Sequence, residues 1–208
     1  QVLQQVTGCT KGAVLSLTKG IPAASGLGGG SSDAAAGLCA LNQMWGTGLN
    51  REALAKIAAQ LGSDVPFFLY GGTALAEGRG EAVTPLPATP RLWLVIVKPP
   101  LEVPSKTARL YSSLKSSHYS KGEATASMIR RLRQGQPLEP GLLYNVFEKV
   151  AFDVFPGLES YRQSLLSAGA TDVHLAGSGP SLFALAENKR EAGAIARALR
   201  ARGIQRYV

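Results

Sequence analysis

Residues 20–36 read GIPAASGLGGGSSDAAA, a glycine-rich block that leads directly into a run of alanines. Glycine has no Cβ atom, so the backbone at Gly26 and at residues 28–30 can adopt positive φ angles and turn several N–H groups toward one point. Such a bend suits an anion. The rest of the chain is interpreted outward from this block.

A helix is predicted to begin at the end of the block. Ser31 and Ser32 are good N-cap residues, and Leu38 and Trp45 follow the alanines at helical spacing. A helix N-terminus carries about half a positive charge and several unpaired N–H groups, so phosphate is the expected ligand. A flexible glycine linker is the alternative, but a linker does not lead into a capped amphipathic helix.

Two common phosphate loops are excluded. No Gly-Lys-Ser/Thr follows the glycines, and no acidic residue ends a following strand at the distance that the Rossmann fingerprint requires. The pattern P-x-x-x-G-L-G-G-G-S-S-D-A-A over residues 22–35 instead resembles the ATP loop of the GHMP kinases. Its G-G-G-S-S-D string is most similar to the members that phosphorylate 4-diphosphocytidyl-2-C-methyl-D-erythritol in the non-mevalonate isoprenoid pathway. The resemblance implies that ATP binds at Pro22, Ala23, Ala24, Ser25, Gly26, Leu27, Gly28, Gly29, Gly30, Ser31 and Ser32.

Asp64 is the candidate for proton transfer. It lies in the string G-S-D-V-P, residues 62–66, between the predicted end of a helix and an apolar run, and Pro66 restrains the backbone beside it. A carboxylate with apolar neighbours needs a partner or a function, although ordinary loop aspartates are common. The string resembles the Gly-Ala/Ser-Asp-Val-Pro motif of the same kinases. Their aspartate acts as general base on the substrate hydroxyl, so the resemblance implies that role for Asp64.

Residues 176–181 read A-G-S-G-P-S, a second glycine-rich string between two predicted strands. A plain tight turn would account for it. The string also resembles the third GHMP motif, a glycine loop that meets the ATP loop, and this resemblance implies that Gly177, Ser178 and Gly179 belong to the site. Asn145 lies in another string that resembles the family, and either a structural or a site-lining role is open for it.

Residues 103–114 predict an amphipathic helix with Thr107, Leu110 and Tyr111 on one side. On this pattern alone, Tyr111 could be a core residue. In the resembled kinases, a threonine is followed four residues later by an aromatic ring that stacks on the cytosine of the substrate. Thr107 and Tyr111 match that spacing, so the resemblance implies that they bind the substrate.

Periodicity and turn residues predict an α+β chain. Helices are expected over residues 1–8, 31–45, 50–62, 103–114, 123–134, 157–168 and 188–203. Strands are expected over residues 13–18, 92–97, 173–176, 181–186 and 204–208, with a hairpin over 73–83 and a mobile loop over 112–122. From residue 91 the order of strand, helices, strand, strand, helix and strand is that of a ferredoxin-like split βαβ.

The domain boundary is expected at about residue 88, in a proline-rich connection. The resemblance implies that residues 1–88 are part of the GHMP kinase N-terminal ATP-binding domain, with an S5 domain 2-like fold that is incomplete here. Residues 89–208 would form the ferredoxin-like C-terminal domain of the GHMP kinase fold.

Some side-chain positions follow from the same patterns. Leu61 and Ala194 are expected on the inner faces of their helices. His118 and His174 are expected at the surface, because the first lies in a serine-rich loop and the second stands alone among apolar neighbours. Neither histidine is expected to act as a ligand or a base.

The composition predicts a globular protein. With 208 residues, 45% of them hydrophobic, the chain can bury a core. No apolar run approaches the roughly 20 residues that cross a bilayer, and the order of a secretion signal is missing, so a cytoplasmic protein without a membrane partner is expected. Cys9 and Cys39 lack metal-ligand spacing and are interpreted as buried thiols.

The formal net charge of +8 would suit a nucleic-acid binder. The basic residues are spread along the chain, however, and cluster only in the predicted helices 123–134 and 188–203. A solvated helix face explains such clusters first, and attraction of anionic nucleotides second. Nucleic acid is therefore not expected as a partner.

The resemblance implies an enzyme that transfers the γ-phosphate of ATP to a small-molecule alcohol, 4-diphosphocytidyl-2-C-methyl-D-erythritol. Mg²⁺ would bridge the phosphates, and its protein ligands stay unassigned. The alternatives are another GHMP kinase, acting on mevalonate, homoserine or a sugar, and a non-catalytic nucleotide- or RNA-binding fragment. The oligomeric state is left open.

The first residues suggest that a segment precedes them. Gln1 is not a start methionine, and residues 1–8 read as the tail of a helix. The resemblance implies an upstream motif P-x-K-x-N-L whose lysine works beside the aspartate. We therefore expect the polypeptide of 208 residues by itself to show little kinase activity, and full turnover from it would contradict this expectation.

Overall fold

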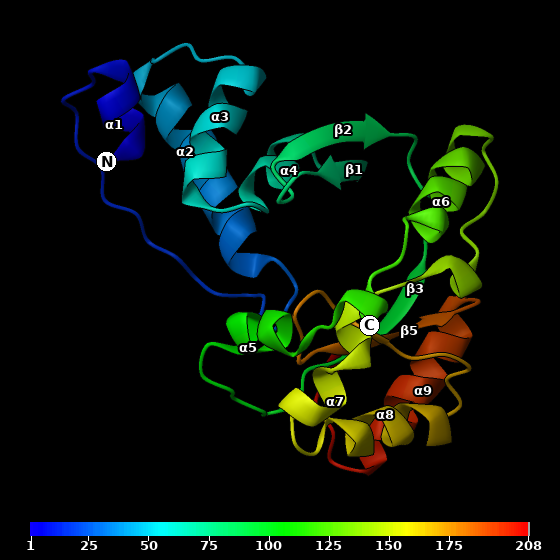
Figure 1. Ribbon diagram of the computed structural model, residues 1–208. Coiled ribbons are helices and arrows are strands. Elements are labelled where there is room, and N and C mark those ends of the chain that lie inside the picture. The colour runs from blue at the N-terminus through cyan, green and yellow to red at the C-terminus, as the bar shows by residue number, and fades with distance from the viewer. Residues whose placement is uncertain (208) are drawn as a thin grey trace. The chain divides into compact units, whose positions relative to one another are not determined.

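A computed structural model describes residues 1–207 of the chain (Figure 1). The chain packs as two compact units. The first unit combines Gln1–Ala23 with Gly28–Ala88, and the second combines Ala24–Leu27 with the chain from Thr89 onward. A four-residue piece of the glycine-rich block therefore belongs to the second unit, while the residues on either side of it belong to the first.

The first unit is a small helical cluster with one hairpin. Its helices α1, α2 and α3 lie side by side in Figure 1, and the hairpin adjoins α4. Leu3, Leu38, Trp45, Ile57 and Val65 are buried together at the centre of the cluster. The elements are α1 (Val2–Thr7), α2 (Gly29–Trp45), α3 (Arg51–Leu61), α4 (Val65–Tyr70), β1 (Thr73–Glu77) and β2 (Ala82–Leu86).

Helix ends in this unit follow the capping rules. Asn50 caps α3 because its side chain accepts a hydrogen bond from the N–H of Ala53 at 2.9 Å. Gly46 ends α2 in the left-handed conformation, with φ 68°. The hairpin pairs Thr73 with Leu86 in antiparallel register. These elements confirm the predictions for residues 31–45, 50–62 and 73–83 to within two residues at most ends.

Three predictions for the first unit are wrong. Residues 8–28 form neither helix nor strand, and Val14 is 98% exposed. The apolar run over residues 13–18 is therefore no strand here, since no segment among residues 1–207 pairs with its N–H and C=O groups. Leu61 is mostly solvent-exposed because α3 turns it away from the cluster.

The third error concerns the start of α2. Its N-cap is Gly28, with φ 70°, rather than Ser31 or Ser32. The two serines lie inside the first turn, where the Ser32 hydroxyl donates to the carbonyl of Gly29 at 3.0 Å. A Cβ atom at position 28 would stand 2.7 Å from Cζ of Phe68, so only glycine fits where the helix begins.

The second unit is a four-stranded antiparallel sheet with helices. The sheet has the order β4-β5-β3-β6. The elements are β3 (Trp93–Val97), α5 (Lys106–Ser113), η1 (Ser116–His118), α6 (Glu123–Arg133), η2 (Pro140–Leu142), η3 (Val146–Lys149), α7 (Ala151–Val154), α8 (Leu158–Ser167), β4 (His174–Leu175), β5 (Leu182–Ala186), α9 (Lys189–Ala201) and β6 (Arg206–Tyr207).

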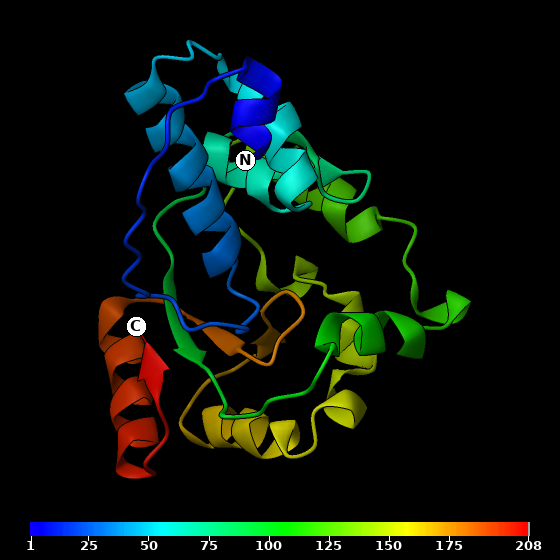
Figure 2. The ribbon, with the colours of Figure 1, turned by 90° about the vertical axis from the view of Figure 1, so that its left-hand side faces the viewer.

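This order confirms the split βαβ prediction. A helix-containing segment joins β3 to β4, a short turn joins β4 to β5, and α9 joins β5 to β6. The first and last strands of the series, β3 and β6, pair at the centre and edge of the sheet, as they do in a ferredoxin-like fold. In Figure 2, β6 runs beside α9 at the C-terminal end of the chain.

The two faces of the sheet differ. Val95 pairs with Ala184 and Val97 with Leu182, and all four side chains are buried under α8 and α9 with Phe155, Leu165, Ile195 and Leu199. Successive side chains of a strand point to opposite faces, so His174, Phe183 and Ile96 share the other face. The main core therefore lies between the sheet and its helices.

Three predictions for the second unit need correction. His174 is buried, not at the surface, because its ring packs on Phe183 with 5.5 Å between ring centroids. Ala194 is exposed, and Ala192 and Ala196 take the inner positions of α9 instead. Residues 112–122 include the helical turn η1. The predicted last strand is described as Arg206–Tyr207, and Val208 lies outside the described residues.

Two general findings concern the described chain. Within residues 1–207, no helix combines the length and apolar character that a bilayer crossing requires. Cys9 and Cys39 are both free thiols, and Cys39 is exposed rather than buried as expected.

We expect Leu199→Ala to lower the free energy of unfolding by about 3 kcal/mol, because Leu199 is fully buried between α9 and the sheet. Leu92→Ala is the matched control, since Leu92 is 39% exposed and its loss should cost less than about 1 kcal/mol. Urea unfolding of both variants measures the difference. Equal losses would show that the core does not lie on this face of the sheet.

Candidate active site

The piece of the glycine-rich block in the second unit is strained into a sharp bend. Ala24 has φ 52° and Gly26 has φ 84°, both in the left-handed region. A Cβ atom at position 26 would stand 2.1 Å from the carbonyl oxygen of Ala176. No side chain fits in that space, so the backbone of Gly26 lies directly on the second glycine string.

The contact is reciprocal. A Cβ atom at position 177 would stand 2.8 Å from the carbonyl oxygen of Gly26, and one at position 179 would stand 2.8 Å from Cδ1 of Leu175. The N–H of Ser181 donates to the carbonyl of Ser25 at 3.1 Å. The structure thus brings together, within one unit, two predicted glycine strings that are about 150 residues apart in the sequence.

Several backbone N–H groups of these two strings have no partner among residues 1–207. They belong to Gly26, Gly177 and Ser178, whereas the N–H of Gly179 donates to Ala176. The buried hydroxyl of Ser181 is also without a hydrogen-bond partner in that range. Unpaired N–H groups gathered in glycine turns form a nest that suits the oxygen atoms of an anion.

The remaining part of the block lies in the first unit at the start of α2. The N–H of Ser32 donates to the carbonyl of Gly28 at 2.9 Å and closes the first turn. The N–H groups of Gly29, Gly30 and Ser31 make no hydrogen bond within residues 1–207, as expected of a helix N-terminus. Pro22 and Ala23 precede the bend in the same unit.

Lys19 is a residue that sequence reasoning missed. Its ammonium group forms an ion pair with Asp33, which lies just after the first turn of α2. It also stands 3.6 Å from the position that a Cβ atom of Gly29 would take, so a positive charge lies at the N-terminus of the helix. The only signal in the sequence is one basic residue just before the glycine-rich block.

Asp64 is the N-cap residue of α4, and its carboxylate is exposed. Within residues 1–207 this carboxylate makes no hydrogen bond and no ion pair. Phe68 follows four residues later on α4, and its ring fills the space beside Gly28. Oδ1 of Asp64 lies 3.7 Å from the position that a Cβ atom of Gly80 would take, so the carboxylate adjoins the turn of the β1–β2 hairpin.

Thr107 and Tyr111 lie one turn apart on α5. The Thr107 hydroxyl is 3.2 Å from the Ser178 hydroxyl, which joins α5 to the second glycine string. The Tyr111 ring is 58% exposed and meets Phe147 edge-to-face, with 5.0 Å between ring centroids. Tyr111 is therefore packed against one ring and is not the core residue that the helical pattern allowed.

Lys106 is a second residue that sequence reasoning missed. Its ammonium group donates to the carbonyls of Gly179 and Ser178. Burial, and after it the charge of Lys98, holds the pKa of Lys106 below the ordinary value of a lysine. A half-buried positive charge thus lies against the second glycine string, where it would favour an anionic ligand.

We expect Gly26→Ala to lower the free energy of unfolding by about 1 to 3 kcal/mol, because the new Cβ would collide with Ala176 and the φ angle disfavours a side chain. Gly37→Ala in the middle of α2 is the control. Its Cβ meets nothing within 4 Å, so it should raise the stability by about 0.5 to 1 kcal/mol. Thermal unfolding checks the opposite signs, and a stable Gly26→Ala protein would contradict the packing of the two strings.

Comparison with known proteins adds to this geometry. Residues 1–72 match the family model of the GHMP kinases N terminal domain, and residues 125–205 match the model of the GHMP kinases C terminal domain. The two matches together cover more than half of the chain.

The chain is also similar to individual proteins. It is 47% identical over 199 residues to a 4-diphosphocytidyl-2-C-methyl-D-erythritol kinase of Dehalococcoides mccartyi, which covers 95% of this chain and 70% of the relative. A crystal structure of 4-(cytidine 5'-diphospho)-2C-methyl-D-erythritol kinase superposes with a TM-score of 0.80 at 35% identity, over 99% of this chain and 73% of the other. A homoserine kinase from Cytophaga hutchinsonii superposes less closely, with a TM-score of 0.67 at 25% identity, over 91% of this chain and 66% of the other.

The kinase named for the cytidine compound has a higher sequence identity and a higher TM-score than the homoserine kinase. The GHMP kinase fold expected from the glycine-rich block is confirmed by the family models and by the superposition. The chain therefore belongs to the GHMP kinases and, within them, to the family of the 4-diphosphocytidyl-2-C-methyl-D-erythritol kinases.

Proposed function

We propose that this chain catalyses the ATP-dependent phosphorylation of the 2-hydroxyl group of 4-diphosphocytidyl-2-C-methyl-D-erythritol, a step of the non-mevalonate isoprenoid pathway. The observation that carries the proposal is the 47% identity, over nearly the whole chain, to a kinase named for that substrate. The unpaired N–H groups of the two glycine strings and the unpaired carboxylate of Asp64 supply the groups that such a reaction needs.

The triphosphate of ATP would be held mainly by backbone. Phosphate oxygens accept hydrogen bonds, and the free N–H groups at Gly26, Ser178 and the start of α2 are donors without competing partners in residues 1–207. Lys19 and Lys106 add positive charge. The proposed ATP-binding residues are those of the block, Pro22–Ser32, together with Gly177, Ser178 and Gly179.

Asp64 would act as the general base. Its carboxylate takes the proton of the substrate hydroxyl as the hydroxyl oxygen forms a bond to the γ-phosphorus of ATP. The bond from that phosphorus to the bridging oxygen breaks at the same stage, and ADP leaves with the electron pair. An exposed carboxylate that makes no hydrogen bond within residues 1–207 is available to accept this proton.

Thr107 and Tyr111 would bind the cytidine end of the substrate. The Tyr111 ring is 58% exposed, and its exposed part can contact a pyrimidine while Phe147 packs against the ring. The Thr107 hydroxyl already lies beside Ser178. Substrate and second glycine string would thereby be linked through α5.

We also propose Mg²⁺ as the ion that neutralises the triphosphate, since phosphoryl transfer from ATP depends on such neutralisation. No three acidic, histidine or cysteine side chains converge on one point within residues 1–207. Such an arrangement fits an ion held chiefly by phosphate oxygens and water with few protein ligands. A cytoplasmic location, a division into domains at residue 88 and the lack of a nucleic-acid partner are parts of the same proposal.

Asp64→Asn should reduce kcat by a factor of about 10² to 10⁴ while the affinity for ATP stays unchanged, because the amide cannot accept the proton. The assay uses wild-type and variant proteins expressed from the complete open reading frame that encodes this chain. Asp153→Asn, an exposed carboxylate in α7, is the control for the loss of one negative charge. A non-catalytic binding protein would instead bind equally in all three forms and transfer no phosphate in any of them.

Tyr111→Leu should raise KM for the cytidine substrate about tenfold and leave KM for ATP unchanged, because a stacked base loses about 1 to 3 kcal/mol with its aromatic partner. Tyr119→Leu, another exposed ring, is the control. The same assay with mevalonate, homoserine or a sugar in place of the cytidine compound tests the substrate class. Faster phosphorylation of any of these acceptors would overturn the proposed substrate.

A further inference from the structure

Both the oxygen and the nitrogen of the Asn145 side-chain amide form hydrogen bonds with backbone groups. Its Oδ1 accepts from the N–H of Phe147 at 3.1 Å and caps η3. Its Nδ2 donates to the carbonyl of Leu175 at 3.0 Å and to the carbonyl of Gly177 at 2.8 Å. Asn145 thus fixes two carbonyl groups at the start of the second glycine string.

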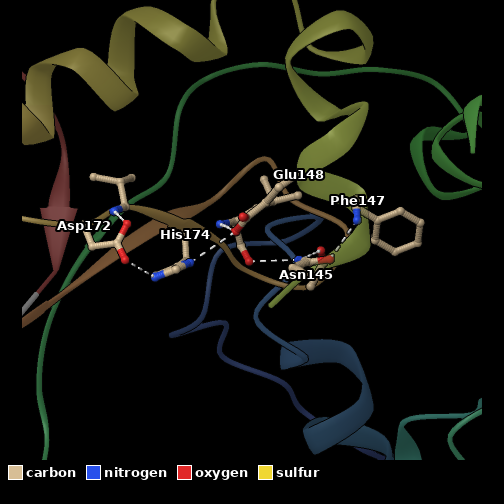
Figure 3. Close-up of polar contacts among 8 residues, drawn as sticks. Asn145, Phe147, Glu148, Asp172 and His174 are labelled. Atoms are coloured by element: carbon tan, nitrogen blue, oxygen red, sulfur yellow. Dashed lines mark hydrogen bonds and ion pairs between the residues drawn. The ribbon is translucent and has the colours of Figure 1, made fainter. Parts of the chain in front are cut away.

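Glu148, which lies within η3, contacts the same string. Its Oε1 accepts from the N–H of Leu175 at 2.8 Å and lies 3.5 Å from Nδ1 of His174 (Figure 3). On its other side, Nε2 of His174 is 3.1 Å from Oδ2 of Asp172. The buried His174 ring therefore stands between two carboxylates and restrains Glu148. Leu175 is held by both its N–H and its C=O groups.

These contacts decide where an unpaired N–H group points. A trans peptide unit is planar, and its C=O and N–H bonds point in opposite directions. Because Asn145 holds the carbonyl of Gly177, the N–H of Ser178 in the same peptide unit must point away from Asn145. That N–H has no partner within residues 1–207. Asn145 therefore fixes the direction of the Ser178 N–H group, which can donate to a ligand.

The same string also seats Gly26. The Ala176 carbonyl and the Gly179 backbone leave no room for a Cβ atom on Gly26, and a Cβ atom on Gly177 would stand 2.8 Å from the Gly26 carbonyl. Any shift of residues 175–177 must therefore shift the bend at Gly26. Residues 175–177 therefore contact both the Ser178 N–H group and the bend at Gly26, the two parts of the proposed triphosphate site in this unit. They are held in turn by Asn145 and Glu148.

We infer that Asn145 and Glu148 are positioning residues for ATP: they fix residues 175–177 so that the Ser178 N–H and the bend at Gly26 face the triphosphate. Neither side chain needs to touch the nucleotide. The inference rests on the proposed function, since it requires that these donors bind phosphate. For Asn145, between the structural and the site-lining role that the sequence left open, it favours a structural role next to the site.

Asn145→Asp is the sharpest test. Aspartate keeps the acceptor that caps η3 and loses both donors, and it sets a carboxylate against two carbonyl oxygens. In protein from the complete coding frame, KM and Kd for ATP should rise at least about tenfold, while KM for the cytidine substrate changes less than about twofold. The matched control is Asn188→Asp, because Asn188 also caps a helix, α9, with its Oδ1 and has no contact with the string.

Glu148 gives an independent pair. Glu148→Gln keeps an oxygen that can accept from the Leu175 N–H and should keep the ATP affinity within about threefold, whereas Glu148→Ala should weaken ATP binding about tenfold. This pair also carries the test if Asn145→Asp is too unstable to purify. A merely structural role would lower the melting temperature and the amount of active protein but leave KM for ATP unchanged.

The outcomes separate the two proposals. If the wild-type protein binds ATP and phosphorylates the cytidine compound but Asn145→Asp and Glu148→Ala bind ATP normally, the positioning inference is wrong and the proposed function stands. If Asn188→Asp weakens ATP binding as much as Asn145→Asp does, the effect comes from charge alone and the inference is again wrong. If the wild-type protein binds no ATP, both proposals fall.

Discussion

The direct packing of Gly26 on the backbone of residues 176–179 is the constraint on which the second unit's share of the site depends. A Cβ atom at position 26 would stand 2.1 Å from a carbonyl oxygen, closer than any real contact, so the two chain segments approach without side chains between them. Glycine is required at 177 for the same reason, whereas a Cβ atom at 179 would collide with the side chain of Leu175. This packing explains why residues 24–27 belong to the second unit although the flanking residues belong to the first.

A lysine ammonium group lies beside each of the two glycine strings. The start of α2 offers unpaired N–H groups and the positive end of a helix dipole, with Lys19 beside it. In the second unit, Lys106 keeps a half-buried ammonium group on the carbonyls of the second string, and its lowered pKa records the cost of burying that charge near Lys98. Each unit thus carries a lysine ammonium group beside its part of the glycine strings.

The family assignment and the geometry support each other at different levels. Family models and relatives identify the chain as a GHMP kinase of the cytidine-compound family, but they do not say which atoms of this chain act. Within residues 1–207, the structure supplies an exposed carboxylate at Asp64 that makes no hydrogen bond, an exposed ring at Tyr111, and N–H groups without acceptors in the glycine strings. The proposed roles follow from what each group still has available for a ligand.

The sequence by itself determined the α+β class, the ferredoxin-like order of elements and the glycine strings, because helix caps, periodicity and the absence of a Cβ are local properties. The resemblance of short motifs to the family also predicted roles for Asp64, Thr107 and Tyr111, and these roles are part of the proposal. Only the tertiary structure decided what depends on distant neighbours. Within residues 1–207 no strand pairs with residues 13–18, and α2 is capped by Gly28, where the Phe68 ring leaves no room for a side chain. His174 is buried between two carboxylates. The hold of Asn145 and Glu148 on a string about 30 residues later could not be predicted from sequence, since a hydrogen bond between segments distant in the chain leaves no local pattern.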